Sequence, residues 1–283
     1  MDHPMNYVKQ VRHLGTLKGS AREQYREEML TERAQEISAY LSEPVAPILD
    51  KMKQGILLTK QLWEKMNPQT EQQIYEFYTK MDTYIYELMF NECMDSRVEQ
   101  TDILLKKIEQ YHPRNVLVYG CGVGSEVIPI LETYPQMEVM IADVPSWHFK
   151  FCIHRLLTRS LNAQAILIKL NTFGSEIPKL FDMIVCFDVF EHVVDAEALA
   201  KNLYEKLNSN GVLLAEFLFN RNSGRKPEKL NTHPLHIERN KEGVLLRGAH
   251  WKSYLKRLGF ESDWVNYGSQ WMKVLRKPNE KKA

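Results

Sequence analysis

The chain has 283 residues, of which 44% are hydrophobic, so it can build one large domain or two modest ones around a substantial core. Its 37 lysines and arginines nearly balance 36 aspartates and glutamates, and the net charge of +1 argues against a broad nucleic-acid-binding surface. The start of the sequence, MDHPMNYVKQ, lacks the apolar segment of a signal peptide, and no apolar run approaches the roughly 18 residues of a membrane helix. We therefore expect a cytoplasmic protein without nucleic-acid or membrane partners.

The four cysteines are typical of a reduced protein. Cys93, Cys121, Cys152 and Cys186 lie far apart, and no C-x-x-C pair occurs, so we expect neither a disulfide framework nor a cysteine-rich metal site. Cys121 falls in a glycine-rich loop and Cys186 in an apolar strand.

Residues 1–112 are predicted to form an all-helical N-terminal domain. Residues 20–23, SARE, match a capping box in which Ser20 caps a helix that should run to about Leu41. A second helical stretch is predicted for residues 45–66.

The third predicted helix has the clearest amphipathic pattern. Apolar side chains recur at helical spacing over residues 74–89, and a fourth helix is expected from about residue 98 to 111. The residues of the apolar face are Ile74, Phe77, Tyr78, Met81, Ile85, Leu88 and Met89. This face could pack on the rest of the chain, or it could meet a second subunit in a homodimer.

Residues 115–126 read NVLVYGCGVGSE and predict a buried strand, a glycine loop and the start of a helix. Gly120, Gly122 and Gly124 let the backbone turn sharply and let a ligand lie against the main chain, near the unpaired N–H groups at the helix start. The Rossmann fingerprint of dinucleotide-binding proteins needs a glycine where Ser125 stands, and no P-loop pattern occurs.

A second strand is predicted over residues 138–141 and closes on Asp143. This acid follows the glycine loop by about 20 residues, where an acidic side chain accepts hydrogen bonds from both hydroxyls of a ribose. Because Pro145 and Ser146 follow, a helix cap is the alternative role for Asp143.

A third motif lies at residues 181–193, FDMIVCFDVFEHV, where a buried strand is followed by Asp188 and then by Glu191-His192. Together with the glycine loop, Asp143 and the turn NGVLL at residues 210–214, this motif resembles the class I S-adenosylmethionine-dependent methyltransferases. It is most similar to the branch that includes quinone-biosynthesis and sugar O-methyltransferases. The resemblance covers residues 111 to about 277, including a late helix that closes on a Gly-Phe pair.

The resemblance implies an α/β fold, a Rossmann-like class I methyltransferase sheet of seven strands with the last one antiparallel, at residues 113–283. The residues themselves agree, because strands and helices alternate after Pro113, which predicts a parallel sheet with helices on both faces. The short link at residues 267–269 predicts a terminal antiparallel hairpin at the sheet edge.

The resemblance also implies S-adenosyl-L-methionine as the cofactor. The residues expected to bind it are Gly120, Gly122, Gly124, Asp143, Val144, Asn171, Thr172, Phe187 and Asp188. Residues 147–149, WHF, could pack on the adenine or in the core.

Two positions depart from the family pattern. Val118 stands where the family usually has an acid, so another residue, from the N-terminal region, is expected to anchor the methionine end of the cofactor. Asn171-Thr172 stands where the family often has an acidic residue beside the adenine, and the Asn171 amide can still bond the adenine edge because it offers a donor and an acceptor.

The N-terminal helices could complete the core or act as a lid. In the resembling family a segment just before the first strand often folds across the cofactor. Tyrosine offers a flat apolar ring with a polar tip, which suits contact with a sulfonium or a substrate ring. The tyrosines that crowd this segment are Tyr75, Tyr78, Tyr84 and Tyr86.

Methyl transfer needs an aligned nucleophile and a group that accepts its proton, and a neutral histidine suits that task. His192, after the fourth strand, and His236, in the long segment after the fifth, are the catalytic candidates, with His233 close to the second. His250 is expected to be an ordinary surface or capping residue. Glu191 and these histidines could converge on a metal, but their spacing is not a recognised ligand set, so no metal is predicted.

The sequence therefore predicts a methyltransferase that acts on an oxygen or nitrogen of a small-molecule acceptor, with a peptide as the alternative acceptor. A catalytically silent scaffold for partner binding is the alternative that the Val118 departure allows. A nicotinamide oxidoreductase is disfavoured by the glycine spacing and by the motif after the fourth strand.

Overall fold

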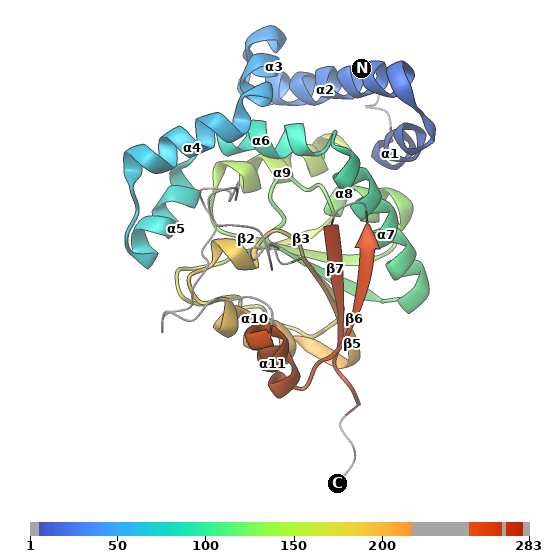
Figure 1. Cartoon of the computed structure of the whole chain (residues 1–283), viewed down its shortest axis with the longest axis vertical. Helices are drawn as coiled ribbons and strands as arrows, with labels where there is room; N and C mark the ends of the chain where they lie inside the picture. The colour runs from blue at the N-terminus through green and yellow to red at the C-terminus, as the bar shows by residue number, and fades with distance from the viewer. Residues whose placement is uncertain (1–5, 217–248, 268–269, 280–283) are drawn as a thin grey trace.

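A seven-stranded sheet forms the centre of the molecule, with helices on both faces (Figure 1). The computed structural model describes residues 6–216, 249–267 and 270–279. The strands are β1 (Asn115–Tyr119), β2 (Glu138–Asp143), β3 (Gln164–Leu167), β4 (Phe181–Cys186), β5 (Leu207–Glu216), β6 (Glu261–Tyr267) and β7 (Gln270–Arg276).

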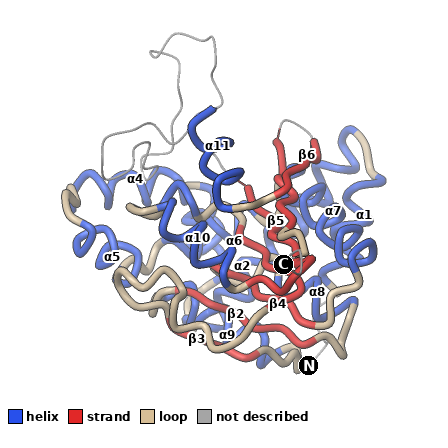
Figure 2. The backbone as a smooth tube through the Cα atoms, turned by 90° about the horizontal axis from the view of Figure 1, so that it is seen from below, coloured by secondary structure: helices blue, strands red, loops and turns tan. Residues whose placement is uncertain are grey.

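The strand order is β3-β2-β1-β4-β5-β7-β6, with β3 and β6 at the two edges (Figure 2). Strands β1 to β5 pair in parallel, whereas β7 runs antiparallel to both β5 and β6. This arrangement confirms the predicted seven-stranded α/β sheet with an antiparallel last strand, and the hairpin forms because so short a link can join only antiparallel neighbours.

The sheet divides the core into two clusters because successive side chains of a strand point to opposite faces. On β1, Val116 and Val118 belong to the cluster shared with the N-terminal helices, while Leu117 and Tyr119 belong to the cluster on the other face. The helices that cover that other face are α10 (Ala196–Glu205) and α11 (Ala249–Leu258) (Figure 2). Val118 is 1% exposed, so the position that usually carries an acid is part of the core.

In the described part of the chain, seven helices precede the first strand. They are α1 (Tyr7–Thr16), α2 (Gly19–Leu41), α3 (Val45–Lys53), α4 (Gly55–Met66), α5 (Glu71–Lys80), α6 (Tyr84–Asn91) and α7 (Asp95–Tyr111). The predicted helix end at Leu41 is confirmed, but the predicted cap is wrong. Lys18 is the N-cap residue of α2 and makes no side-chain cap hydrogen bond, so Ser20 lies inside the first turn.

The predicted helix over residues 45–66 is two helices that meet at Gln54. Gly55 approaches α6 so closely that a Cβ there would lie 2.6 Å from the Cα of Glu87. The break lets the start of α4 pack against that backbone, which an amphipathic pattern in the sequence does not reveal.

The predicted amphipathic helix over residues 74–89 is also two helices, α5 and α6, separated by an extended Met81. Its apolar face is divided between two clusters. Phe77 and Met81 pack in a small separate cluster, while Ile85 and Met89 join the large cluster beside the sheet. Because these four side chains are buried within the chain, they are not a free surface for a second subunit.

The remaining helices connect the strands. They are α8 (Val127–Thr133), α9 (Trp147–Thr158) and the short 3-10 helix η1 (Phe190–His192). The late helix ends as expected, with Gly259 at a φ of 103° and Phe260 buried. Among the described residues, none of the helices combines the length and the hydrophobicity that a membrane-spanning segment needs.

Candidate functional site

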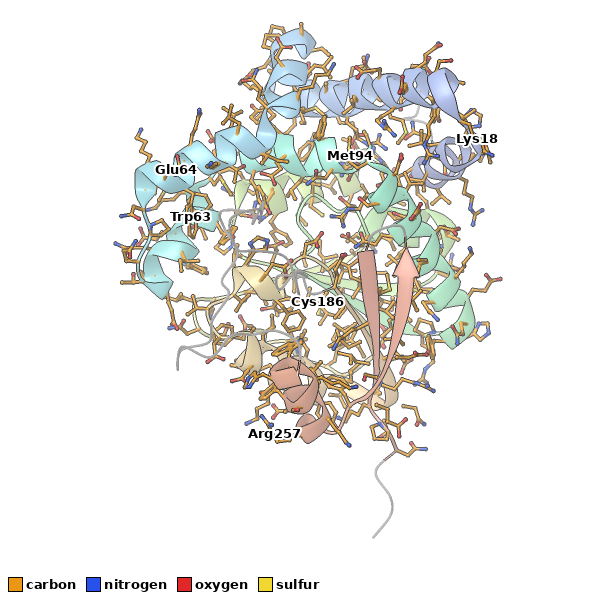
Figure 3. The ribbon with its side chains drawn as sticks, in the orientation of Figure 1. Lys18, Trp63, Glu64, Met94, Cys186 and Arg257 are labelled. Carbon is orange, nitrogen blue, oxygen red and sulfur yellow. The ribbon has the colours of Figure 1, made fainter. Side chains whose placement is uncertain are left out.

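A cavity of about 320 Å³ lies at the carboxyl ends of β1, β2 and β4, the edge where open α/β sheets bind ligands. Its lining includes the loops that follow these strands and side chains from α5 and α6. Cys186, the last residue of β4, lies near the centre of the molecule (Figure 3), and the next residue, Phe187, lines the cavity.

The glycine loop has a backbone conformation that favours glycine. Gly120 and Gly122 have φ angles of 70° and 54°, and a Cβ on Gly120 would lie 2.3 Å from Cγ2 of Val189. Both glycines line the cavity, while Gly124 packs behind the loop, where a Cβ would lie 3.0 Å from Sγ of Cys152. The loop therefore presents bare backbone to the cavity.

Asp143 links the end of β2 to the glycine loop. Its Oδ2 accepts the N–H of Gly122 at 2.8 Å and its Oδ1 accepts the N–H of Val144 at 2.7 Å. The side chain lines the cavity, and a carboxylate has further lone pairs for a ligand. The helix-cap alternative does not hold, because Ser146 caps α9 by accepting the N–H of Phe149 at 3.1 Å.

Two of the three residues predicted to lie near the adenine line the cavity. Val144 and Asn171 line the cavity, and Asn171 has a left-handed φ of 61°. The Thr172 hydroxyl instead donates to Oε1 of Glu176 at 2.7 Å, and the neighbouring Phe173 lines the cavity in its place.

Residues 147–149 also lie in different environments. Trp147 is 40% exposed and Phe149 is buried in the core, so only His148 lines the cavity. The Nε2 of His148 lies 3.5 Å from Oδ1 of Asp143, and its Nδ1 is buried without a hydrogen-bond partner in the described part of the chain.

A charged group absent from every sequence motif lines the cavity beside the glycine loop. Arg97 of α7 donates from Nη2 to Oδ2 of Asp188 at 2.7 Å and from Nη1 to Oε1 of Glu126 at 2.9 Å. The other oxygen of Asp188, Oδ1, is buried and has no hydrogen-bond partner among the residues that the structure describes. The missing acid at Val118 is the one sequence signal that pointed to an N-terminal contribution here.

Glu126 should make the stability of the protein depend on pH. Burial, opposed by Arg97 and reinforced by Asp188, raises the pKa of its carboxyl from 4.5 to about 7. Between these two values the folded chain binds more protons than the unfolded chain. The contribution of Glu126 to the unfolding free energy is thus complete below the lower value and is lost as pH rises through about 7, by roughly 3 kcal/mol in total.

The variant Glu126→Gln tests this prediction because it is neutral at every pH and keeps an acceptor for Arg97. Urea unfolding of both proteins at about pH 5 and about pH 8 isolates the contribution of this carboxyl. We expect the stability advantage of the wild type over the variant to shrink at the higher pH. A difference that does not change with pH would contradict the raised pKa.

Tyr78 of α5 and His192 of η1 meet in the cavity. The Tyr78 hydroxyl lies 2.8 Å from Nδ1 of His192. Desolvation, followed by the charges of Glu191 and Glu87, raises the pKa of Tyr78 well above its ordinary value, so the phenol stays neutral. The structure thus places the predicted histidine in the cavity and adds a partner 114 residues away in the sequence, which no local motif reveals.

The other tyrosines of the segment have different environments. Tyr75 lines the cavity and donates to the carbonyl oxygen of Ile168 at 3.3 Å, and Tyr84 also lines it. Tyr86 points away and accepts a hydrogen bond from Nζ of Lys51 at 3.2 Å. Helix α5 therefore lies against the cavity through one face, which carries Tyr75 and Tyr78.

Of the remaining histidine candidates, the structure describes only His250, which is not part of this cavity lining. His233 and His236 lie outside the described residues. His250 opens α11 and has its Nε2 2.9 Å from Oε1 of Glu197. No group of three or more His, Cys, Asp or Glu side chains in the described ranges is placed to hold a metal ion.

Comparison with known proteins adds to this geometry. A family model for a methyltransferase domain matches residues 89–263. The chain is 27% identical over 164 residues to Phosphoethanolamine N-methyltransferase 1 of Triticum aestivum, a match that covers 55% of this chain and 32% of that protein. The chain thus spans about a third of the length of that relative.

Two solved structures show the same fold at low identity. An O-methyltransferase family protein from Burkholderia thailandensis aligns with a TM-score of 0.58 and 16% identity, covering 82% of this chain and 71% of the other. A protein of Nostoc punctiforme PCC 73102 that is assigned as an O-methyltransferase aligns with a TM-score of 0.58 and 14% identity, covering 81% and 73%.

Proposed function

Because this chain belongs to the class I S-adenosylmethionine-dependent methyltransferases, we propose that the cavity binds S-adenosylmethionine and that the enzyme methylates an oxygen or nitrogen of a small-molecule acceptor. The observation that carries the proposal is the hydrogen bond between Tyr78 and His192 inside the cavity, because it orients a group that can accept the acceptor's proton. The curated relative is named for an N-methylation and the solved neighbours for O-methylation, so both acceptor atoms stay in the proposal.

The nucleoside half of the cofactor has fitting partners. The carboxylate of Asp143 is oriented by the N–H groups of Gly122 and Val144 and can accept hydrogen bonds from ribose hydroxyls. Val144 offers an apolar contact for the adenine, and the Asn171 amide offers a donor and an acceptor for its edge. A side chain at Gly120 or Gly122 would be strained at these φ angles, so the loop keeps open the backbone on which the cofactor would lie.

The methionine half also has partners, and these come partly from the N-terminal helices. Arg97 would bind the carboxylate of the methionine end, since guanidinium and carboxylate groups form charge-assisted hydrogen bonds. The buried Oδ1 of Asp188, without a partner in the described chain, would accept a hydrogen bond from the ammonium. In this proposal Asp188 binds the ammonium, which an acid at position 118 could otherwise bind, and Arg97 both orients Asp188 and binds the carboxylate.

The bound cofactor supplies a methyl group activated by a sulfonium, and the protein aligns the acceptor and receives its proton. A neutral Tyr78 can donate to Nδ1 of His192 or accept from it. In this proposal Tyr78 accepts from Nδ1–H, and Nε2 of His192 takes the proton of the acceptor during the reaction. Residues 1–112 act in this proposal as a helical cap that supplies Tyr78 and Arg97 to a methyltransferase domain at residues 113–283.

Calorimetric titration with S-adenosylmethionine and, separately, NADH tests the cofactor. We expect binding of the first alone. Transfer of a labelled methyl group to a panel of small phenols, alcohols and primary amines, with short peptides as the alternative class, then tests the acceptor. Failure of folded, ligand-free protein to bind S-adenosylmethionine would remove the proposed function.

Replacing Tyr78 by phenylalanine should lower kcat about 10-fold and leave the dissociation constant of S-adenosylmethionine near its wild-type value. The variant keeps the ring but loses one hydrogen bond, which is worth about 1 kcal/mol, and frees the His192 ring to adopt the unproductive tautomer. Steady-state kinetics measures the effect. The matched control is Tyr86→Phe, since Tyr86 points away from the cavity, and equal kcat values for the two variants would contradict the role of Tyr78.

A further inference from the structure

Glu92, the residue after α6, joins the N-terminal helices to the glycine loop. Its carboxylate is 0% exposed and receives four donors. Oε1 accepts from Oγ of Ser125 at 2.8 Å and from Nη1 of Arg155 at 2.7 Å, and Oε2 accepts from Nε of Arg33 at 2.8 Å and from Nη2 of Arg155 at 2.9 Å. The junction of α6 and α7 that carries Glu92 lies beside Met94, which is labelled in Figure 3.

Arg155 holds the loop at a second point. Its Nη1 also donates to the carbonyl oxygen of Val123 at 2.7 Å. Val123 and Ser125 flank Gly124, and both line the cavity. Glu92 and Arg155, which bind each other, therefore hold the glycine loop at Ser125 and Val123.

Further hydrogen bonds connect the Glu92–Arg155 pair to α1, α2 and α9. Arg33 of α2 donates from Nη2 to Oε1 of Gln10 in α1 at 2.8 Å and from Nη1 to Oε1 of Glu36 at 3.0 Å. Arg155 of α9 donates from Nε to Oε2 of Glu36 at 2.8 Å. Burial would raise the pKa of Glu92, but the charges of Arg155 and Arg33 outweigh burial and lower it, so the carboxylate stays ionised at neutral pH.

We propose that Glu92 is a positioning residue for the cofactor, which fixes the glycine loop through the hydroxyl of Ser125 so that the N-terminal helices set the affinity for S-adenosylmethionine. This inference rests on the proposed function of the cavity. A loop held in its binding conformation before the ligand arrives loses less conformational freedom on binding, which favours affinity. It also gives a physical role to the serine that replaces the third Rossmann glycine.

The variant Ser125→Ala tests the contact without leaving a charge unpaired, because Glu92 keeps its three N–H donors. We expect the dissociation constant of S-adenosylmethionine to rise about 5- to 10-fold, while the melting temperature and the KM of the acceptor stay close to those of the wild type. Ser125→Thr keeps the hydroxyl and should restore the affinity. If Ser125 had only a structural role, Ser125→Ala would lower the melting temperature and leave the dissociation constant of S-adenosylmethionine unchanged.

A double-mutant cycle with Glu92→Gln separates positioning from direct contact of Ser125 with the cofactor. If Glu92 acts through Ser125, the losses of affinity in the two single variants do not add in the double variant. Additive losses, or an unchanged affinity in Ser125→Ala, would overturn the inference. If Glu92→Gln does not fold, the comparison of alanine with threonine at position 125 decides. Absence of binding by the wild type would instead overturn the proposed function itself.

Discussion

Replacing His192 by alanine is expected to lower kcat by about 10²- to 10⁴-fold, the range typical for the loss of a side chain that accepts or donates a proton in the rate-limiting step. The side chain lines the cavity, and its Nδ1 lies 2.8 Å from the hydroxyl of Tyr78, which holds the ring in place. The affinity for S-adenosylmethionine should change little, because the proposed cofactor contacts do not include this ring. Steady-state kinetics and calorimetry together measure both quantities.

His250→Ala is the matched control. His250 is also a partly buried histidine with a side-chain partner, Glu197, but it lies outside the cavity lining, so the kcat of this variant should stay near the wild-type value. A His192→Ala variant with the kcat of the control would remove His192 from the mechanism. It would also point to the second sequence candidate, His236, as the next residue to replace.

The sheet could be predicted from the sequence because each strand carries its own local signal. Residues 115–119 and 181–186 are apolar runs, one ending at the glycine loop and the other shortly before an acid. These two strands pair in parallel, as the alternation of strands and helices along the chain predicts. The helix breaks could not be predicted in the same way. The break at Gln54 depends on the contact of Gly55 with the α6 backbone, a tertiary contact that overrides an unbroken helical pattern.

The site shows the same division. Gly120, Gly122 and Asp143 follow neighbouring parallel strands in motifs whose spacing is local, so the sequence pattern alone predicts that they meet at one edge of the sheet. Arg97 and Tyr78 act from helices that precede the motifs, and each meets its partner across a long stretch of chain, 91 residues for Arg97 and Asp188. The tyrosines of residues 75–86 and the missing acid at Val118 predicted a contribution from the N-terminal helices, but a single sequence contains no signal for which residues form each pair.

Replacing Glu92 by alanine is expected to lower the unfolding free energy by about 3–5 kcal/mol, since it leaves buried charges without their shared partner. Arg33 and Arg155 are 2% and 1% exposed, so bulk water does not solvate their charges when the carboxylate is lost. Glu36, whose pKa their charges lower to about 2 against the effect of burial, already binds both guanidiniums, and one carboxylate neutralises only one of the two charges. The melting temperature should fall on the order of 10 °C, which scanning calorimetry measures.

The control for this prediction is an ion pair of the same chemistry at the surface. Glu27 binds Lys53 at 2.9 Å, with side chains 59% and 44% exposed, and Glu27→Ala should cost less than about 1 kcal/mol because solvent screens the pair. Each variant removes one carboxylate, so the difference between their losses of unfolding free energy measures the effect of burial. If Glu92→Ala cost no more than the control, the guanidiniums would have to find other acceptors. In that case the contacts of Arg97 with Glu126 and Asp188, together with apolar packing, would hold the N-terminal helices to the glycine loop, and only the Ser125 contact would connect Glu92 with the cofactor.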